Sequence, residues 1–295
     1  MREYRVVPAS ANRWVLLHYH IFKNAGSTIE YVLQRSFGER FATLHGPAED
    51  SVVTGPGLAS FLDATPEIAA VSSHHVRYPL PVIAHTILFD LCFFRNPLRR
   101  LWSMYHYFRT ADAVGDLARC AKTAQAPAFF DLLLGEYPHL INDVQVNVLA
   151  NGGAYRRPPT AQDLRVALER VRQISVLGVV ELFDESAVTA EYFLRPTFPA
   201  LRFEYVPQNV STARNGADGA PEDRCRDEIG AARYAQLERM NQLDTQLLSF
   251  AREELLRRFE MVPERGERLA SLRRRCEVLQ SAEGNVSALA RRAGA

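Results

Sequence analysis

The fold class of this chain is indicated most clearly by residues 20–28, His20-Ile21-Phe22-Lys23-Asn24-Ala25-Gly26-Ser27-Thr28. This stretch ends an apolar run, residues 14–22, that has the composition of a buried strand, and it precedes an amphipathic segment, residues 29–33. Small residues in the loop let a ligand approach the backbone closely. Free N–H groups and the positive helix end attract an anion, and Lys23 adds a full charge. The stretch therefore predicts a phosphate or sulfate site at a strand-to-helix turn.

The order of residues in this loop distinguishes it from a nucleoside-triphosphate loop. That loop has the pattern G-x-x-x-x-G-K-[ST], in which the lysine follows the glycines. Here Lys23 precedes Gly26, and no glycine lies four residues upstream. The order therefore favours another kind of anion site.

A second strand-to-helix turn is formed by residues 93–105, FFRNPLRRLWSMY. The apolar run 86–94 ends at Arg95, and Pro97 suits the first turn of a helix. Arg95 and Ser103 are eight residues apart, so both side chains can converge on one anion. A planar multidentate cation and a neutral donor together suit a phosphate group.

Both turns resemble motifs of the sulfotransferases that use 3'-phosphoadenosine 5'-phosphosulfate (PAPS), especially the carbohydrate branch. Residues 20–28 resemble the donor loop, and residues 93–105 resemble the element that binds the 3'-phosphate. Further similarities to this family lie in residues 178–186, 208–211 and 237–259. The chain is thus identified as similar to the heparan-sulfate 2-O-sulfotransferase-like branch and its bacterial-type relatives.

The resemblance implies an α/β fold, a P-loop-like three-layer sandwich with a mostly parallel central sheet flanked by helices. PAPS would be the donor co-substrate, and no metal would be required. The residues implied to contact the donor are Lys23, Asn24, Ala25, Gly26, Ser27, Thr28, Arg95, Ser103, Ser211 and Arg214. Lys23 would also act in catalysis, by neutralising charge on the bridging oxygen as the S–O bond breaks.

A general base is needed because the acceptor hydroxyl loses a proton as it attacks sulfur. Members of the resembled branch use a histidine before a valine, commonly in the pattern H-x-H-V. Here the pattern is Ser73-His74-His75-Val76, which places His75 at the base position and Ser73 at the first histidine. His75 is the expected base, His74 is the alternative, and Glu30 ranks behind both. His18 and His20 are expected to be packed or hydrogen-bonded on the incoming strand.

These features predict in-line transfer of a sulfuryl group to an acceptor hydroxyl on a carbohydrate or small molecule. One alternative is a P-loop ATP-dependent kinase, in which Asp90 would bind magnesium, although the apolar run continues past Asp90 and places it in mid-strand. A second alternative is a catalytically inactive nucleotide-binding relative, suggested by Ser73 in place of a histidine.

Composition agrees with one globular α/β domain: 295 residues, 47% hydrophobic and 23% charged. The net charge of +1 provides no overall field that would recruit nucleic acid or a membrane surface. The four cysteines are widely spaced and form no C-x-x-C pair. The N-terminus lacks an apolar signal core, and no stretch reaches the roughly 20 apolar residues of a membrane span. We therefore expect a soluble, cytoplasmic protein.

Two units are expected along the chain: a sulfotransferase domain over residues 1–262 and a charged helical tail over 263–295. Strands are expected at 14–22, 68–73, 86–94 and 174–180, and helices include 27–36, 97–109, 161–173, 185–194 and 237–259. Apolar residues recur in the tail at steps of three and four. They predict either a docking or coiled-coil helix that joins two copies into a homodimer, or a loose charged appendage.

Overall fold

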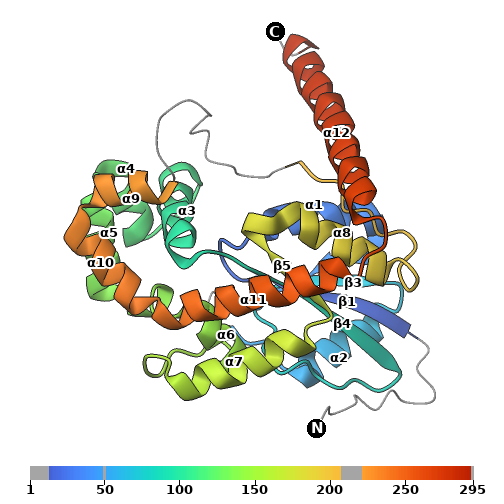
Figure 1. The fold of residues 1–295 in the computed structure, drawn as a ribbon, viewed down its shortest axis with the longest axis horizontal. Coiled ribbons are helices and arrows are strands. Elements are labelled where there is room, and N and C mark those ends of the chain that lie inside the picture. The colour runs from blue at the N-terminus through green and yellow to red at the C-terminus, as the bar shows by residue number, and fades with distance from the viewer. Residues whose placement is uncertain (1–12, 49–50, 207–220, 294–295) are drawn as a thin grey trace.

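The central element of the computed structural model is a five-stranded, all-parallel sheet (Figure 1). The structure describes residues 13–48, 51–206 and 221–293. The strands are β1 (Arg13–Tyr19), β2 (Phe41–Thr43), β3 (Ala70–Ser73), β4 (Thr86–Phe94) and β5 (Val176–Val179), in the order β2-β3-β1-β4-β5. This topology confirms the expected α/β class. Because all strands are parallel, their carboxyl ends meet at one edge, where such folds bind ligands.

Helices cover both faces of the sheet, as expected for a three-layer sandwich. One face carries α1 (Gly26–Phe37), α8 (Phe183–Leu194) and α12 (Arg265–Ala293). The other carries α2 (Gly55–Ala64), α6 (Val144–Asn151), α7 (Ala161–Gln173) and α11 (Gln242–Glu260). Successive side chains of β1 point to opposite faces of the sheet. Leu16 therefore packs in the core on the first face, and Leu17 packs in the core on the second.

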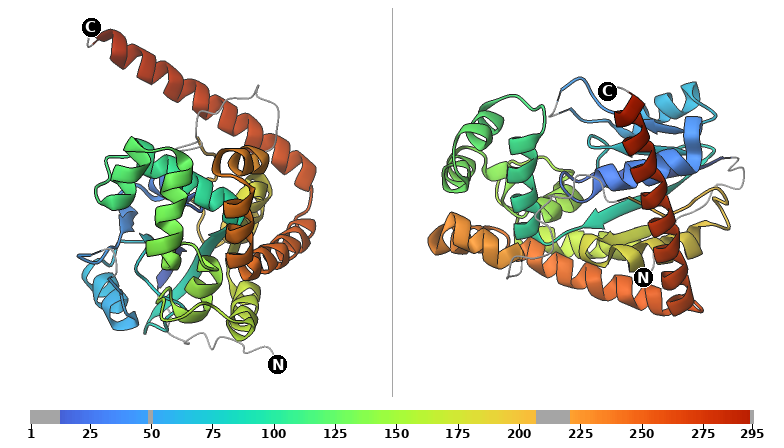
Figure 2. Two further views of the ribbon diagram at one scale, coloured as in Figure 1. Left: turned by 90° about the vertical axis from the view of Figure 1, so that its left-hand side faces the viewer. Right: turned by 90° about the horizontal axis from the view of Figure 1, so that it is seen from above.

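A helical lobe extends beyond the carboxyl edge of the sheet (Figures 1 and 2). It consists of α3 (Pro97–Thr110), α4 (Asp116–Thr123), α5 (Ala126–Glu136), α9 (Pro221–Ile229) and α10 (Ala231–Met240). Its own core includes the fully buried rings of Phe129 and Phe130. Short 3-10 turns lie at Gly38–Arg40, Pro138–Leu140 and Val180–Leu182.

Several predicted boundaries match the structure closely, notably those of β4 and α7. Thr160 and Asp163 form a reciprocal capping box at the start of α7. The predicted strand 14–22 is too long, because β1 ends at Tyr19 and the chain then turns through Lys23 (φ 66°) and Ala25 (φ 61°).

The expected continuous helix over 237–259 is wrong, since α10 ends at Met240 and α11 begins at Gln242. Between them Asn241 is buried, and its Nδ2 donates to the carbonyl of Leu237 over 2.8 Å. A polar side chain that hydrogen-bonds the preceding turn competes with helix continuation.

Helix α2 was not predicted, because Gly55-Pro56-Gly57 resembles a loop. The structure starts a helix there, with the Thr54 hydroxyl accepting from the Gly57 N–H over 3.3 Å. Proline is compatible with this first turn, where its missing N–H has no intrahelical partner.

The tail forms α12, whose first half packs on the body of the protein. Leu272 and Cys276 are buried in the core shared with α8, and Leu269 packs against it. The far end of α12 projects away from the sheet (Figure 2). The first apolar residues of the tail therefore pack against the rest of the same chain. The homodimer and the domain boundary at residue 262 stay predictions.

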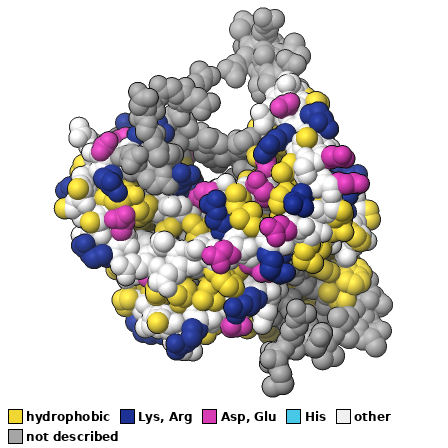
Figure 3. Space-filling view, viewed as in Figure 1, with side chains coloured by type: hydrophobic (Ala, Val, Ile, Leu, Met, Phe, Trp, Pro, Cys, Tyr) yellow, Lys and Arg dark blue, Asp and Glu magenta, His cyan; other side chains and the backbone are white. Residues whose placement is uncertain are grey.

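The surface carries charges of both signs. On the face shown in Figure 3, basic and acidic side chains are interspersed, in keeping with the net charge of +1. Among the helices of the described ranges, none is long and apolar enough to cross a membrane.

Candidate functional site

The loop between β1 and α1 presents unpaired backbone donors. The N–H of Asn24 donates to Ile21 and the N–H of Thr28 to Ala25, over 3.1 and 3.0 Å. Within the described ranges, the N–H groups of Ala25, Gly26 and Ser27 have no hydrogen-bond partner, and no side chain caps the helix. Three converging donors at a helix N-terminus are well suited to an anion.

Lys23 lies beside these donors in a partly buried position. Its Nζ sits 4.4 Å from the centre of the Tyr107 ring. Burial and the nearby Arg95 lower the pKa of Lys23 to about 8. The cation is therefore destabilised in the free protein, and a bound anion would relieve this cost.

The side chain of Asn24 is used in hydrogen bonds inside the protein. Its buried side chain donates from Nδ2 to the carbonyl of Phe93 and to Gln145 Oε1, both over 2.8 Å. These bonds tie the loop to the end of β4. The predicted contact of Asn24 with a donor nucleotide stays a prediction, and its N–H is already used inside the loop.

Arg95 joins the second turn to the first. Its Nη1 donates to the backbone carbonyl of Lys23 over 2.9 Å, and burial lowers the pKa of the guanidinium. The Arg95 N–H donates to Gln145 Oε1, and Gln145 Nε2 donates to the Arg95 carbonyl, each over 2.9 Å. The two sequence motifs thus form one site.

Gln145 was missed by sequence reasoning. It lies in α6, is fully buried, and contacts both Asn24 and Arg95. Asp244 of α11 accepts from the Gln145 and Val146 N–H groups over 3.0 and 2.8 Å, which anchors the start of α6. Nothing in the local pattern around Gln145 indicates this role.

Two other polar residues of the second motif hold the fold together, and a third lies half-buried on the helix. Asn96 caps α3 by accepting from the N–H groups of Leu98 and Arg99. Arg100 is buried and donates to the Leu140 carbonyl, so it is structural. Ser103 is half-buried on α3. Ser211 and Arg214, predicted to contact the donor, lie outside the described residues.

A column of stacked imidazoles stands next to the anion loop. The ring of His20 lies between those of His18 and His74, with centroids 5.2 and 3.7 Å away, and His45 stacks outside His74 at 5.6 Å. His20 also touches the loop directly, because a Cβ added to Gly26 would lie 1.7 Å from its Nε2. Glycine at position 26 is therefore required by the histidine column.

Glu30 anchors this column. Its Oε1 accepts from His20 Nδ1 over 2.9 Å and from the Ser72 hydroxyl over 2.8 Å, and that hydroxyl accepts from His18 Nδ1 over 2.9 Å. Burial opposes ionisation of Glu30, but the contacts with His20 and Ser72 outweigh it and lower the carboxyl pKa. Glu30 is thus a carboxylate that accepts hydrogen bonds from His20 and Ser72 through Oε1.

Hydrogen bonds set different tautomers for the two histidines expected as candidate bases, His75 and His74. The Gly46 N–H donates to Nδ1 of His75 over 2.7 Å, so the neutral His75 ring carries its proton on Nε2. His74 Nδ1 lies 2.6 Å from the His20 carbonyl, which can only accept, so His74 keeps its lone pair on Nε2. Burial and the neighbouring His20 lower the pKa of His74 to about 4, which keeps it neutral at pH 7. The tautomers therefore leave a free acceptor nitrogen, Nε2, on His74 and a protonated Nε2 on His75, while the lowered pKa makes the His74 ring a weaker base than free histidine.

The same cluster contains the atoms best placed for a metal. His18, His20 and Glu30 present ligand atoms within 4.8 Å of one another, and they are the only such group in the searched part of the chain. Nδ1 of His18 bonds Ser72, and Nδ1 of His20 bonds Oε1 of Glu30, so a cation bound to these atoms would have to displace protons. The expectation of metal-free transfer stays a prediction.

The kinase alternative places a magnesium ligand at Asp90. Asp90 lies within β4, where its Oδ1 accepts from the N–H and hydroxyl of Ser175 over 2.9 and 2.7 Å, and Tyr78 approaches Oδ2 at 3.4 Å. Asp90 therefore joins β4 to the start of β5, away from the strand ends where the anion motifs lie.

Comparison with known proteins assigns no activity. No protein-family model matches the chain. A protein of Archaeoglobus fulgidus, described only as uncharacterized, is 25% identical over 244 residues, which cover 79% of this chain and 94% of that protein. The chain thus has an archaeal relative of similar extent.

Proposed function

We propose that this protein transfers a sulfuryl group from PAPS to an acceptor hydroxyl on a carbohydrate. The observation that carries the proposal is the hydrogen bond between Arg95 and the Lys23 carbonyl, 2.9 Å long, which joins the two motifs resembling donor-binding elements. The unpaired N–H groups of Ala25, Gly26 and Ser27 supply the oxyanion contacts such a donor needs.

The roles of the residues follow from their positions. The loop amides bind the 5'-phosphosulfate, and Arg95 and Ser103 bind the 3'-phosphate. The acceptor oxygen attacks sulfur in line as the bond from sulfur to the bridging oxygen breaks, and Lys23 compensates charge on that oxygen. The acceptor proton passes to a histidine, for which His74 Nε2 has the correct tautomer.

Nucleotide binding tests the donor assignment. We would titrate the protein with 3'-phosphoadenosine 5'-phosphate in a calorimeter, beside ATP–magnesium, and repeat both titrations on Arg95→Ala. The control is Arg109→Ala, an exposed cation in the last turn of α3, the helix that follows Arg95. Binding of the bisphosphate without metal, lost only in Arg95→Ala, is expected. Binding of ATP–magnesium alone would favour the kinase alternative.

Matched asparagine variants test the base. Asparagine retains a donor and an acceptor near the position of histidine Nδ1 but offers nothing at Nε2. His75→Asn preserves an acceptor for Gly46, so transfer should continue if His75 is structural. His74→Asn should lose roughly 100-fold or more in rate while binding nucleotide normally. Loss of transfer in His75→Asn alone would restore His75 as the base. Failure of both variants and wild type to transfer sulfate would favour the inactive nucleotide-binding alternative.

A further inference from the structure

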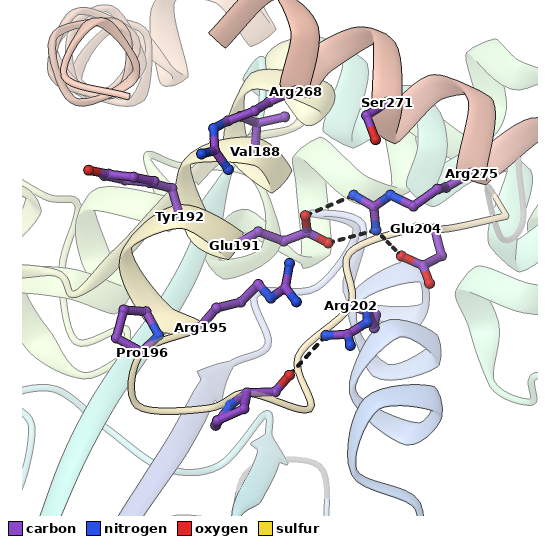
Figure 4. A pocket seen from close by; sticks show the side chains of 11 residues that line it. Val188, Glu191, Tyr192, Arg195, Pro196, Arg202, Glu204, Arg268, Ser271 and Arg275 are labelled. Atoms are coloured by element: carbon purple, nitrogen blue, oxygen red, sulfur yellow. Dashed lines mark hydrogen bonds and ion pairs between the residues drawn. The ribbon is translucent and has the colours of Figure 1, made fainter. Parts of the chain in front are cut away.

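A second group of cations lines a groove formed by 11 residues (Figure 4). The groove has a volume of about 680 Å³ and lies between α8, the segment 195–204 that follows it, and α12. The ring of Phe198 in this segment lies 6.0 Å from Phe37 at the end of α1, and 5.5 Å from Phe89 in the first half of β4. The groove therefore belongs to the amino edge of the sheet, opposite the anion loop.

The two acidic residues of the groove, Glu191 and Glu204, share one arginine. Arg275 donates to both carboxylate oxygens of Glu191, over 3.0 and 2.8 Å, and it also contacts Glu204. The Phe203 N–H adds a bond to Glu191 over 2.7 Å. One guanidinium thus contacts both carboxylates of the groove, and no ion pair joins either carboxylate to another arginine in the described part of the chain.

Three further arginines line the groove without a carboxylate partner in the described part of the chain: Arg195, Arg202 and Arg268. Arg202 is held by the Pro199 carbonyl at 2.8 Å. Arg268 is held by the Pro263 carbonyl at 2.9 Å and lies 5.4 Å from the centre of the Tyr192 ring. Each bond uses only part of a guanidinium, so the remaining N–H donors are oriented in advance and available for an anion.

We propose that this groove binds a segment of an anionic oligosaccharide. The four arginines and two glutamates that line the groove give it a net charge of +2, more than the whole chain carries. Guanidinium groups recognise sulfate and carboxylate through paired hydrogen bonds, and three of them in an open groove match a ligand with several separated charges.

The chemistry of the groove distinguishes a sugar chain from a nucleic acid. Binding of single-stranded nucleic acid relies on aromatic rings that stack on bases. The aromatic residue lining this groove, Tyr192, already has the Arg268 guanidinium over its ring. Sulfate or carboxylate groups on a glycan need only the arginines and the Ser271 hydroxyl.

The test uses a heparin octasaccharide as the probe and the full chain as the protein. Calorimetry would compare wild type with the triple variant Arg195→Ala, Arg202→Ala, Arg268→Ala. A matched triple variant, Arg156→Ala, Arg239→Ala, Arg252→Ala, removes the same charge from exposed positions outside the groove. The groove variant should bind at least roughly tenfold more weakly and the control should be nearly unchanged. Equal weakening of both, or no binding by wild type at physiological salt, would overturn the proposal.

Two additions keep the result independent of folding and of the proposed transfer activity. Arg195→Glu changes an exposed side chain with no hydrogen bond in the described residues, and it should weaken heparin binding alone. Unchanged binding in Arg195→Glu would contradict the groove. Single-stranded DNA of equal charge should bind less tightly, and equal binding with the same arginine dependence would overturn the glycan assignment. Binding of 3'-phosphoadenosine 5'-phosphate, measured in parallel, reports the donor site separately.

Discussion

Arg95 donates from Nη1 to the backbone carbonyl of Lys23 over 2.9 Å, across a sequence separation of 72 residues. This bond holds the carboxyl ends of β1 and β4 in one site. It also brings two cations together, which contributes to the lowered pKa of Lys23. Like charges held close together in a partly buried site are stabilised by a multivalent anion, so the arrangement favours ligand binding over stability of the free protein.

Gln145→Leu should lower stability by about 1–3 kcal/mol, because the Arg95 N–H loses its acceptor inside the protein. Binding of 3'-phosphoadenosine 5'-phosphate should weaken as well, since Asn24 loses one of two bonds. Urea unfolding and calorimetry measure the two effects. Gln173→Leu, at an exposed position, is the control. An unchanged unfolding midpoint in Gln145→Leu would refute the role of this side chain.

Gly26→Ala should disrupt the anion loop, because the new methyl group would lie 1.7 Å from His20 Nε2. We expect a loss of about 1–3 kcal/mol in stability and strongly weakened nucleotide binding. Adding His20→Ala should restore part of both, which a double-mutant cycle measures. Gly135→Ala, where the new methyl meets nothing within 4 Å, should be tolerated. The absence of any rescue by His20→Ala would contradict the contact.

Anion binding should depend on the charge of Lys23. Its pKa in the free protein is about 8, and a bound anion raises it, so binding takes up a proton above pH 8. Affinity should fall by up to roughly tenfold per pH unit above this value. Calorimetry at pH 8.5 in buffers of different ionisation enthalpy measures the proton uptake. Lys23→Arg, which stays charged, should abolish it; uptake that persists in Lys23→Arg would assign the proton to another group.

Stability should decline between about pH 4 and pH 7 because of Asp143. Burial and the neighbouring Asp244 raise the pKa of Asp143 to about 7, whereas an unfolded aspartate titrates near 4. In this window the folded state binds more protons than the unfolded state, so rising pH destabilises it, by about 1–2 kcal/mol after solvent screening. Asp143→Asn, which keeps an acceptor for the Asp244 N–H, should flatten the pH dependence. Thermal unfolding from pH 4 to pH 8 measures both proteins, and identical slopes would reject the assignment.

Short-range signals made much of the fold predictable. Apolar runs located β1 and β4, and the turns after them were recognised from Lys23, Gly26, Arg95 and Pro97. The capping residues Asn96 and Thr160 start their helices as local chemistry requires. The long helix expected over 237–259 from the resemblance is interrupted at the buried Asn241, whose side chain bonds the Leu237 carbonyl one turn back.

Local sequence was enough to predict an α/β chain with two strand-to-helix turns, because such a turn is encoded by residues that are neighbours in the chain. How the two turns are joined depends on residues that are far apart in the chain and meet on folding. Gln145 meets Asn24 across 121 residues, and His74 meets the His20 carbonyl across 54. The protonated nitrogen of each histidine depends on such distant partners, so the choice between His74 and His75 follows from packing, which no local pattern encodes.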